Sequence, residues 1–268
     1  MKVDVKDYVT KLTAALKKEF GERLLYVGLQ GSYLRKEAGD ASDIDIMAVL
    51  DVLEPEDMDA YRRVVKGLEH ADRSCGFLCG RRELAEWNRC EICHLLHTTM
   101  DCFGRLKELV PEYTQDDVLR YIRLMTGNLY HELCHSRVHG FAPEAALGDG
   151  TPERKAPAKL RKEGSPERPD WERLLPGAFK QAFFILQNKQ YLESGVFAIR
   201  RAELLPLLSG TGRRVLQEEG LAFGSAPEAQ ETAGAKKRLS AEGRFALLFD
   251  WCRETLDWAE KAEPGKRG

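Results

Sequence analysis

Hydrophobic residues recur at every fourth position near the start of the chain and predict a first helix. The positions are Tyr8, Leu12, Leu16 and Phe20, with lysines between them. Apolar residues at this spacing share one face of a helix, and a glycine such as Gly21 is common where a helix ends. We therefore expect an amphipathic helix over residues 5–20.

Short apolar runs then alternate with helical patterns up to about residue 110. Residues 24–30 and 43–50 are two β-rich runs separated by a polar loop, which predicts neighbouring strands. The other elements that we expect are a helix within 54–70, a strand around 76–78, a short helix over 82–87 and a strand over 90–98. This alternation is typical of a small α/β domain.

The pattern becomes helical after Thr114, which forms a near capping box with Asp117. We expect a helix from there, and further helices over 179–192, 202–208 and 245–262. Residues 142–170 are rich in Pro, Gly, Lys and Glu and predict a long loop or flexible insertion. The expected fold class is thus α+β, with a mixed-sheet α/β domain over 1–112 and a helical bundle over 113–268.

Composition and charge narrow the range of partners that we expect for the chain. Its 268 residues are 43% hydrophobic, which is enough for a sizeable core, and 41 Lys+Arg against 43 Asp+Glu give a net charge of -2. This balance lacks the basic excess that binding to a long nucleic acid needs. No apolar run reaches the ~18–20 residues of a membrane helix, and the seven cysteines are an odd number without export features. We expect a cytoplasmic protein with reduced thiols, no membrane partner and an oligomeric state left open.

The candidate chemistry lies between the first two predicted strands. Gly31 and Ser32 follow the first strand, and Asp43 and Asp45 open the second. Carboxylates two residues apart in a strand face the same side, about 6–7 Å apart at Cα, and can share a divalent ion. A Gly-Ser turn exposes backbone N–H groups that suit phosphate oxygens. Together these residues predict a site for phosphate and magnesium.

The segment GLQGSYLRKEAGDASDIDIMAVL resembles the nucleotidyltransferase signature of the DNA polymerase β superfamily. That signature is a hydrophobic residue, Gly, Gly or Ser, about a dozen residues, and then Asp, hydrophobic, Asp or Glu, hydrophobic. Gln30 departs from the first position, and Arg35 stands where many bacterial members carry a basic residue. The order of a small α/β domain and then helices is similar to the aminoglycoside and minimal nucleotidyltransferase branches.

The resemblance implies a reaction and a set of ligands. The reaction would transfer a nucleoside monophosphate from an NTP, with ATP as the expected donor, to a hydroxyl of a small molecule, such as an antibiotic, or of a protein, releasing pyrophosphate. Asp43 and Asp45 would hold two Mg²⁺ ions, and Gly31 and Ser32 would hold the β and γ phosphates. The alternative is an antitoxin-like or degenerate nucleotide-binding module that acts through a protein partner.

Members of this family also carry a third carboxylate on a later strand, as a metal ligand or base. Glu91 is our candidate because it lies between Cys90 and Ile92 at the start of a predicted strand, and Asp101 is the reserve. Lys180, at the start of the helix predicted over 179–192, is a candidate contact for the triphosphate.

Two other patterns compete with this interpretation. Residues 131–135 read HELCH, a zinc-peptidase pattern that places His131 and His135 on one helix face, but no other peptidase motif follows. Packing or a contribution to the pocket is the favoured role for these histidines. Four cysteines have spacings that a zinc cluster also uses, namely Cys75, Cys79, Cys90 and Cys93. We expect them to be small core residues, because cysteine is often buried.

Overall fold

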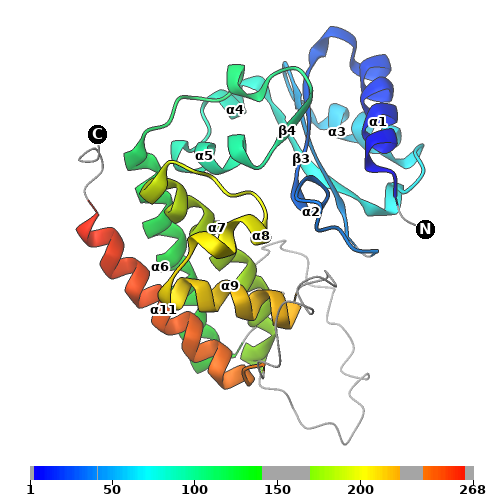
Figure 1. Cartoon of the computed structure of the whole chain (residues 1–268). Coiled ribbons are helices and arrows are strands. Elements are labelled where there is room, and N and C mark those ends of the chain that lie inside the picture. Colours follow the sequence, from blue (N-terminus) through cyan, green and yellow to red (C-terminus); the bar gives the residue numbers. More distant parts are fainter. Residues whose placement is uncertain (1–2, 41, 141–169, 224–237, 263–268) are drawn as a thin grey trace, which may run out of the picture.

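The computed structural model describes residues 3–40, 42–140, 170–223 and 238–262 of the chain, so residues 142–169 of the expected insertion lie outside it. Figure 1 shows a sheet with its helices at one end of the molecule and a group of long helices at the other. We call these parts the sheet half and the helical half. This arrangement confirms the predicted α+β class, while a domain boundary at residues 112/113 stays a prediction.

The sheet has four strands within the described residues. These are β1 (Leu24–Leu29), β2 (Ile44–Leu50), β3 (Ser74–Gly80) and β4 (Met100–Phe103), in the order β3-β2-β1-β4. Strand β1 is antiparallel to both β2 and β4, whereas β2 is parallel to β3. The sheet is therefore mixed, as the sequence predicted, and β2 lies between β1 and β3.

Alternating residues of β2 pack on opposite faces of the sheet. Ile44 and Ile46 are fully buried against α1 (Val5–Phe20) and α3 (Pro55–Lys66). Met47 and Val49 pack on the other face, which α4 (Arg81–Ala85) and α5 (Arg89–His97) cover. The short helix α2 (Gly31–Leu34) follows β1 directly. The period of two along β2 places Asp45 on the face opposite to Ile44 and Ile46.

The prediction of a strand over residues 90–98 is wrong, because this segment forms the helix α5. The side chain of Asn88 caps the helix by accepting a hydrogen bond from the Cys90 amide at 3.2 Å. Cys90, Ile92 and Cys93 are buried along its length, and short apolar runs of this kind do not distinguish a helix from a strand. The strand β4, which the sequence did not predict, follows immediately and is four residues long.

The helical half consists of long helices around one core. The described helices are α6 (Gln115–His139), α7 (Leu175–Ser194), α8 (Arg201–Leu204), α9 (Gly210–Phe223) and α11 (Ala241–Lys261). The capping box predicted for α6 is present, because Thr114 and Asp117 bond reciprocally at 2.9 and 3.3 Å. The helix predicted over 202–208 is shorter than expected, and the sequence analysis did not predict α9, which begins at Gly210.

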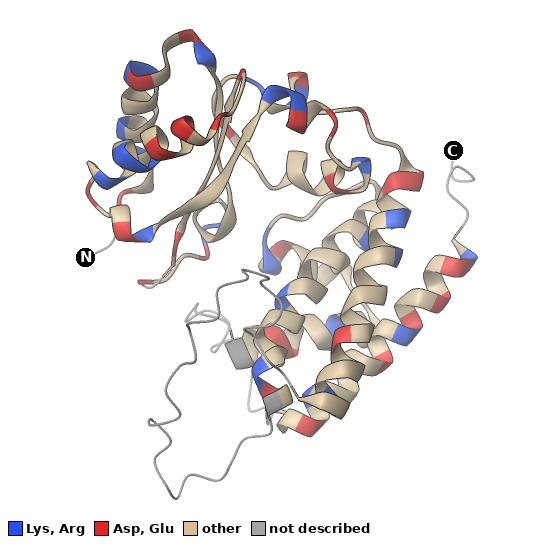
Figure 2. Cartoon of the chain, turned by 180° about the vertical axis from the view of Figure 1, so that it is seen from behind, with Lys and Arg blue, Asp and Glu red and all other residues tan. Residues whose placement is uncertain are grey.

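Helix α5 connects the two halves, because it contributes to both cores. Cys90 and Cys93 pack with the helical core, whereas Leu95 and Leu96 pack under the sheet. His94 lies between them, with its Nδ1 3.1 Å from the amide nitrogen of Asn188 on α7. In Figure 2, Lys and Arg positions are interspersed with Asp and Glu positions along the ribbon of both halves. None of the described helices is long and apolar enough to cross a membrane.

The position of His94 leads to a prediction about pH. Burial, aided by the charges of Arg35 and His97, lowers the pKa of His94 to about 4. The unfolded chain takes up this proton near pH 6.5, so stability is lost as the pH falls from about 6.5 towards 4, by roughly 1 kcal/mol per pH unit. Urea unfolding at several pH values would measure this slope. We expect His94→Gln to flatten it and His139→Gln, a change at an exposed residue, to leave it unchanged.

Candidate functional site

The turn after β1 packs directly against the carboxylate of Asp45. Gly31 has φ +68°, and a Cβ at this position would lie 1.8 Å from Oδ2 of Asp45. The amide of Gln30 also donates a hydrogen bond to the carbonyl oxygen of Asp45 at 2.9 Å. Only glycine fits this position without displacing the carboxylate, because it tolerates a positive φ and needs no space for a side chain. The Gly-Ser turn and the aspartate strand, predicted as neighbours, are in contact.

Asp43 and Asp45 form a pair of carboxylates without a cation in contact among the described residues. Asp43 is exposed just before β2, and Asp45 is half-buried within it. Burial and, to a lesser extent, the charge of Asp43 raise the pKa of Asp45, although Lys180 and Arg35 oppose this shift. Carboxylate oxygens are ligands that Mg²⁺ prefers. Because these two carboxylates are adjacent and no described cation contacts them, the residues present fit a divalent cation.

Two cations reach this site from different halves of the molecule. Arg35 follows α2 and is largely buried, with its Nε 3.0 Å from Glu37. Lys180 lies on α7 in the helical half and is exposed. Both side chains lower the pKa of Asp45 by their charge, and the effect of Lys180 is the larger. The structure thus brings Lys180 and Arg35 into electrostatic range of Asp45, and their contact with a triphosphate stays a prediction.

The loop before Asp43 is held by Arg73, a residue that the sequence analysis missed. The guanidinium of Arg73 donates hydrogen bonds to the carbonyl oxygen of Ser42 at 2.6 and 3.1 Å, and to the hydroxyl of Tyr33 at 2.9 Å. These contacts fix the residue that immediately precedes Asp43. Arg73 enters β3 from a short helical turn, and no motif in the sequence marked it.

Cys75 is a second residue whose place the sequence did not predict. It is paired with Asp45 in the register of β2 and β3, is exposed, and makes a small contribution that lowers the pKa of the Asp45 carboxyl. The expectation that Cys75 is a core residue is therefore wrong, whereas Cys79, Cys90 and Cys93 are buried as predicted. A strand of alternating small and apolar residues gave no signal for the direction of this thiol.

The structure does not bring the candidate third carboxylates to Asp43 and Asp45. Glu91 lies on α5 and accepts a hydrogen bond from the indole of Trp87 at 2.6 Å. Asp101 lies on β4, separated from β2 by β1, and accepts from the Tyr26 hydroxyl at 2.7 Å. No group of three or more His, Cys, Asp or Glu side chains able to hold a metal occurs among the described residues. A role for Glu91 as the third acid stays a prediction.

The HELCH histidines lie on the exposed face of α6. His131 and His135 have ring centroids 6.0 Å apart, and both are exposed. The adjacent Glu132 is also exposed, and Gln181 on α7 donates to it at 3.4 Å. A zinc peptidase binds its metal with a third protein ligand, and the described residues supply none here. This geometry does not favour proteolysis.

Comparison with known proteins supports the interpretation of the fold. The structure is similar to that of spectinomycin adenyltransferase AAD(9) from Enterococcus faecialis with ATP and spectinomycin, with a TM-score of 0.53 and 11% identity over 94% of this chain and 99% of that one. A toxin-antitoxin structure with AMP-PNP matches 51% of this chain and 95% of that chain at 18% identity. Its TM-score of 0.28 is too low to indicate a shared fold. No family profile and no curated protein match the sequence. The chain therefore shares its overall fold with this adenyltransferase.

The contact between Gly31 and Asp45 predicts the effect of a single methyl group. We expect Gly31→Ala to weaken Mn²⁺ binding by about tenfold or more, because the new Cβ must displace the carboxylate. Gly195→Ala is the matched control, since Gly195 has φ +74° but a methyl group there would meet no other part of the protein within 4 Å. Both variants should lose about 1–2 kcal/mol of stability from the positive φ. Equal Mn²⁺ affinity in the two variants, measured by electron paramagnetic resonance, would contradict this account of the site.

Proposed function

We propose that this protein is a nucleotidyltransferase that uses a divalent cation, with ATP as donor and a small-molecule hydroxyl as acceptor. The observation that carries the proposal is the packing of the Gly31 turn against Asp45, beside the uncompensated charge of Asp43. A phosphate-binding turn and a pair of metal-binding carboxylates in contact are what a metal–triphosphate complex requires. The fold similarity to an adenyltransferase supports the same conclusion.

The residues of the turn and of α7 would bind the phosphates. The backbone N–H groups around Gly31 and Ser32 would donate to phosphate oxygens, and the Ser32 hydroxyl has no hydrogen-bond partner among the described residues. Lys180 and Arg35 would offset the negative charge of the triphosphate, each from one half of the molecule. Because Lys180 has no ion pair of its own within the described part of the chain, it can take up a phosphate without breaking an existing contact.

Asp43 and Asp45 would hold the magnesium ions. When bound, Mg²⁺ neutralises charge on the phosphates and aligns the attacking and leaving oxygens. Burial raises the pKa of Asp45, with a smaller contribution from the charge of Asp43, so the apo site is destabilised by its own charge and gains from a cation. In this proposal the two aspartates are sufficient, and Glu91 keeps the structural contact with Trp87 that the fold gives it.

The acceptor class is inferred from fold and charge. The neighbour with a similar fold is a spectinomycin adenyltransferase, which supports a hydroxyl of a small molecule. The net charge of -2 also gives no electrostatic attraction for a long nucleic acid. Aminocyclitol and aminoglycoside antibiotics are therefore the first acceptors to screen, with ATP and Mg²⁺ present and pyrophosphate release as the readout.

Substitution of the carboxylates tests the proposed catalytic set. We expect Asp43→Asn and Asp45→Asn each to reduce pyrophosphate release by about 100-fold or more, because each removes a charged metal ligand. Glu91→Gln is the control. We expect it to keep turnover within about threefold of the wild type, because it alters only a hydrogen bond to Trp87. A loss in Glu91→Gln as large as in Asp45→Asn would contradict the two-carboxylate site and restore Glu91 as the third acid.

The position of Cys75 provides an independent test of nucleotide binding. Its exposed thiol lies beside Asp45, so bound nucleotide and Mg²⁺ should slow its alkylation by iodoacetamide by about tenfold or more. Peptide mass spectrometry would follow the reaction, with the partly exposed Cys134 of α6 as the internal control. An unchanged rate at Cys75 with every NTP and Mg²⁺ would contradict binding at this site and favour the alternative of a module that acts through a protein partner.

A further inference from the structure

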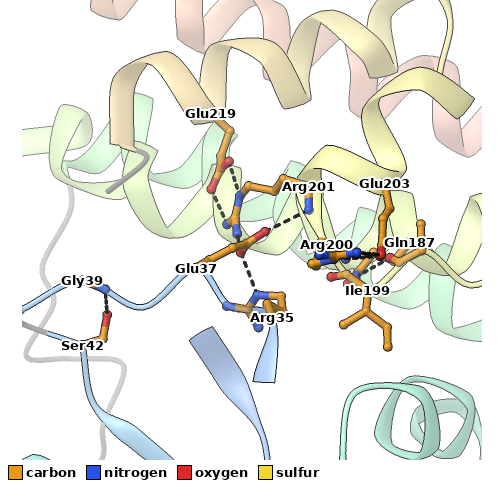
Figure 3. A network of polar contacts seen from close by, with 11 residues as sticks. Arg35, Glu37, Gly39, Ser42, Gln187, Ile199, Arg200, Arg201, Glu203 and Glu219 are labelled. Atoms are coloured by element: carbon orange, nitrogen blue, oxygen red, sulfur yellow. Dashed lines mark hydrogen bonds and ion pairs between the residues drawn. The ribbon is translucent and has the colours of Figure 1, made fainter. Parts of the chain in front are cut away.

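The loop that joins the phosphate turn to the aspartates is attached to the helical half through Glu37. The backbone amide of Arg201, the first residue of α8, donates to Glu37 at 2.9 Å, and the Arg201 guanidinium also bonds to this carboxylate. The other edge of the guanidinium is held by Glu219 of α9 at 2.5 and 2.6 Å. Figure 3 shows Arg201 between these two carboxylates, with Arg35 on the remaining side of Glu37.

This network is buried, and its charges balance. The side chain of Glu219 is only 6% exposed, and those of Arg201 and Glu37 are 26% and 18% exposed. The guanidinium of Arg201 also lies 4.3 Å from the ring of Phe183 on α7, while Arg35 lies 5.9 Å from the same ring. Two arginines and two glutamates thus neutralise one another around an aromatic side chain. Removal of one member leaves a buried charge unpaired, which makes such a contact sensitive to substitution.

The network connects parts of the candidate site that are far apart in sequence. The amide of Glu37 donates to the carbonyl oxygen of Ser32 at 2.9 Å, so Glu37 is fixed to the phosphate turn. On the opposite side, Phe183 lies on α7 three residues after Lys180, on the same face of the helix. The contacts of Arg201 therefore link the turn, in the sheet half, to the helix that carries Lys180, in the helical half.

We propose that Glu37, Arg201 and Glu219 form a clamp between the two halves that positions the loop of residues 31–40 and Lys180 relative to each other. Arg201 is then a positioning residue, since its guanidinium is engaged by two carboxylates and contacts no part of the metal site. The clamp itself follows from the contacts alone. Only its effect on nucleotide binding rests on the proposed function.

Hydrogen–deuterium exchange tests the clamp without any nucleotide. We expect Arg201→Gln to speed exchange in residues 31–40 by about tenfold or more, and Glu37→Gln, a milder change, to do so by a smaller factor. Arg200→Gln is the matched control, because Arg200 precedes Arg201 and its side chain pairs with Glu203 on the surface. Exchange in residues 31–40 that is equal in all three variants and the wild type would overturn the clamp. If Arg201→Gln does not fold, the exchange of Glu37→Gln, compared with the wild type and Arg200→Gln, decides whether the clamp exists.

A double-mutant cycle tests whether the clamp positions Lys180. In the wild type, Lys180→Met should weaken binding of an ATP analogue with Mg²⁺, and in Arg201→Gln the same change should have several-fold less effect, because Lys180 is already displaced. Additive effects would overturn the positioning role. A wild type that binds no nucleotide would instead contradict the proposed function, and the exchange measurement would still decide whether the clamp exists.

Discussion

The candidate site depends on one close contact, the backbone of Gly31 against the carboxylate of Asp45. This contact requires a positive φ and the absence of a side chain, so it fixes the path of the chain as it leaves β1. The same turn brings the amide of Gln30 to β2 and thereby aligns the first two strands. Because the aspartates lie at the start of β2, any shift of the turn would move the proposed phosphate site and the proposed metal site together.

A second constraint is electrostatic. Asp43 and Asp45 repel each other, and within the described residues no cation contacts them, so the fold retains unfavourable charge at the start of β2. The opposing charges come from Arg35 in the loop and Lys180 in the helical half. The two halves therefore contribute to one site, and the buried contacts of Arg201 hold them in this relation. Two neighbouring carboxylates that no cation contacts directly fit a ligand of opposite charge.

The sequence predicted the parts of the fold that depend on local pattern. Helix α1, the strands β1 and β2, and the capped start of α6 follow from periodicity and capping residues. Residues 90–98 were wrongly predicted as a strand. A segment of nine mixed apolar and polar residues fits the period of a helix as well as that of a strand, and here the cap at Asn88 favours the helix. This error also placed Glu91 on a strand that the structure does not have.

The candidate site could be predicted from the sequence only where its residues form a contiguous motif. Gly31, Ser32, Asp43 and Asp45 lie within one short segment, so their spacing revealed them. The contacts of Arg73, Cys75 and Arg201 arise from tertiary pairing, through the register of β2 with β3 and the docking of α8, and a single sequence carries no signal for either.

The most direct test of the account is a calorimetric titration of the full chain with a non-hydrolysable ATP analogue, with and without Mg²⁺. The account predicts binding that requires Mg²⁺ and that is lost when Asp43 and Asp45 are both replaced by asparagine. Binding that persists without Mg²⁺ or in the double variant would contradict the assignment of the metal site to these two carboxylates.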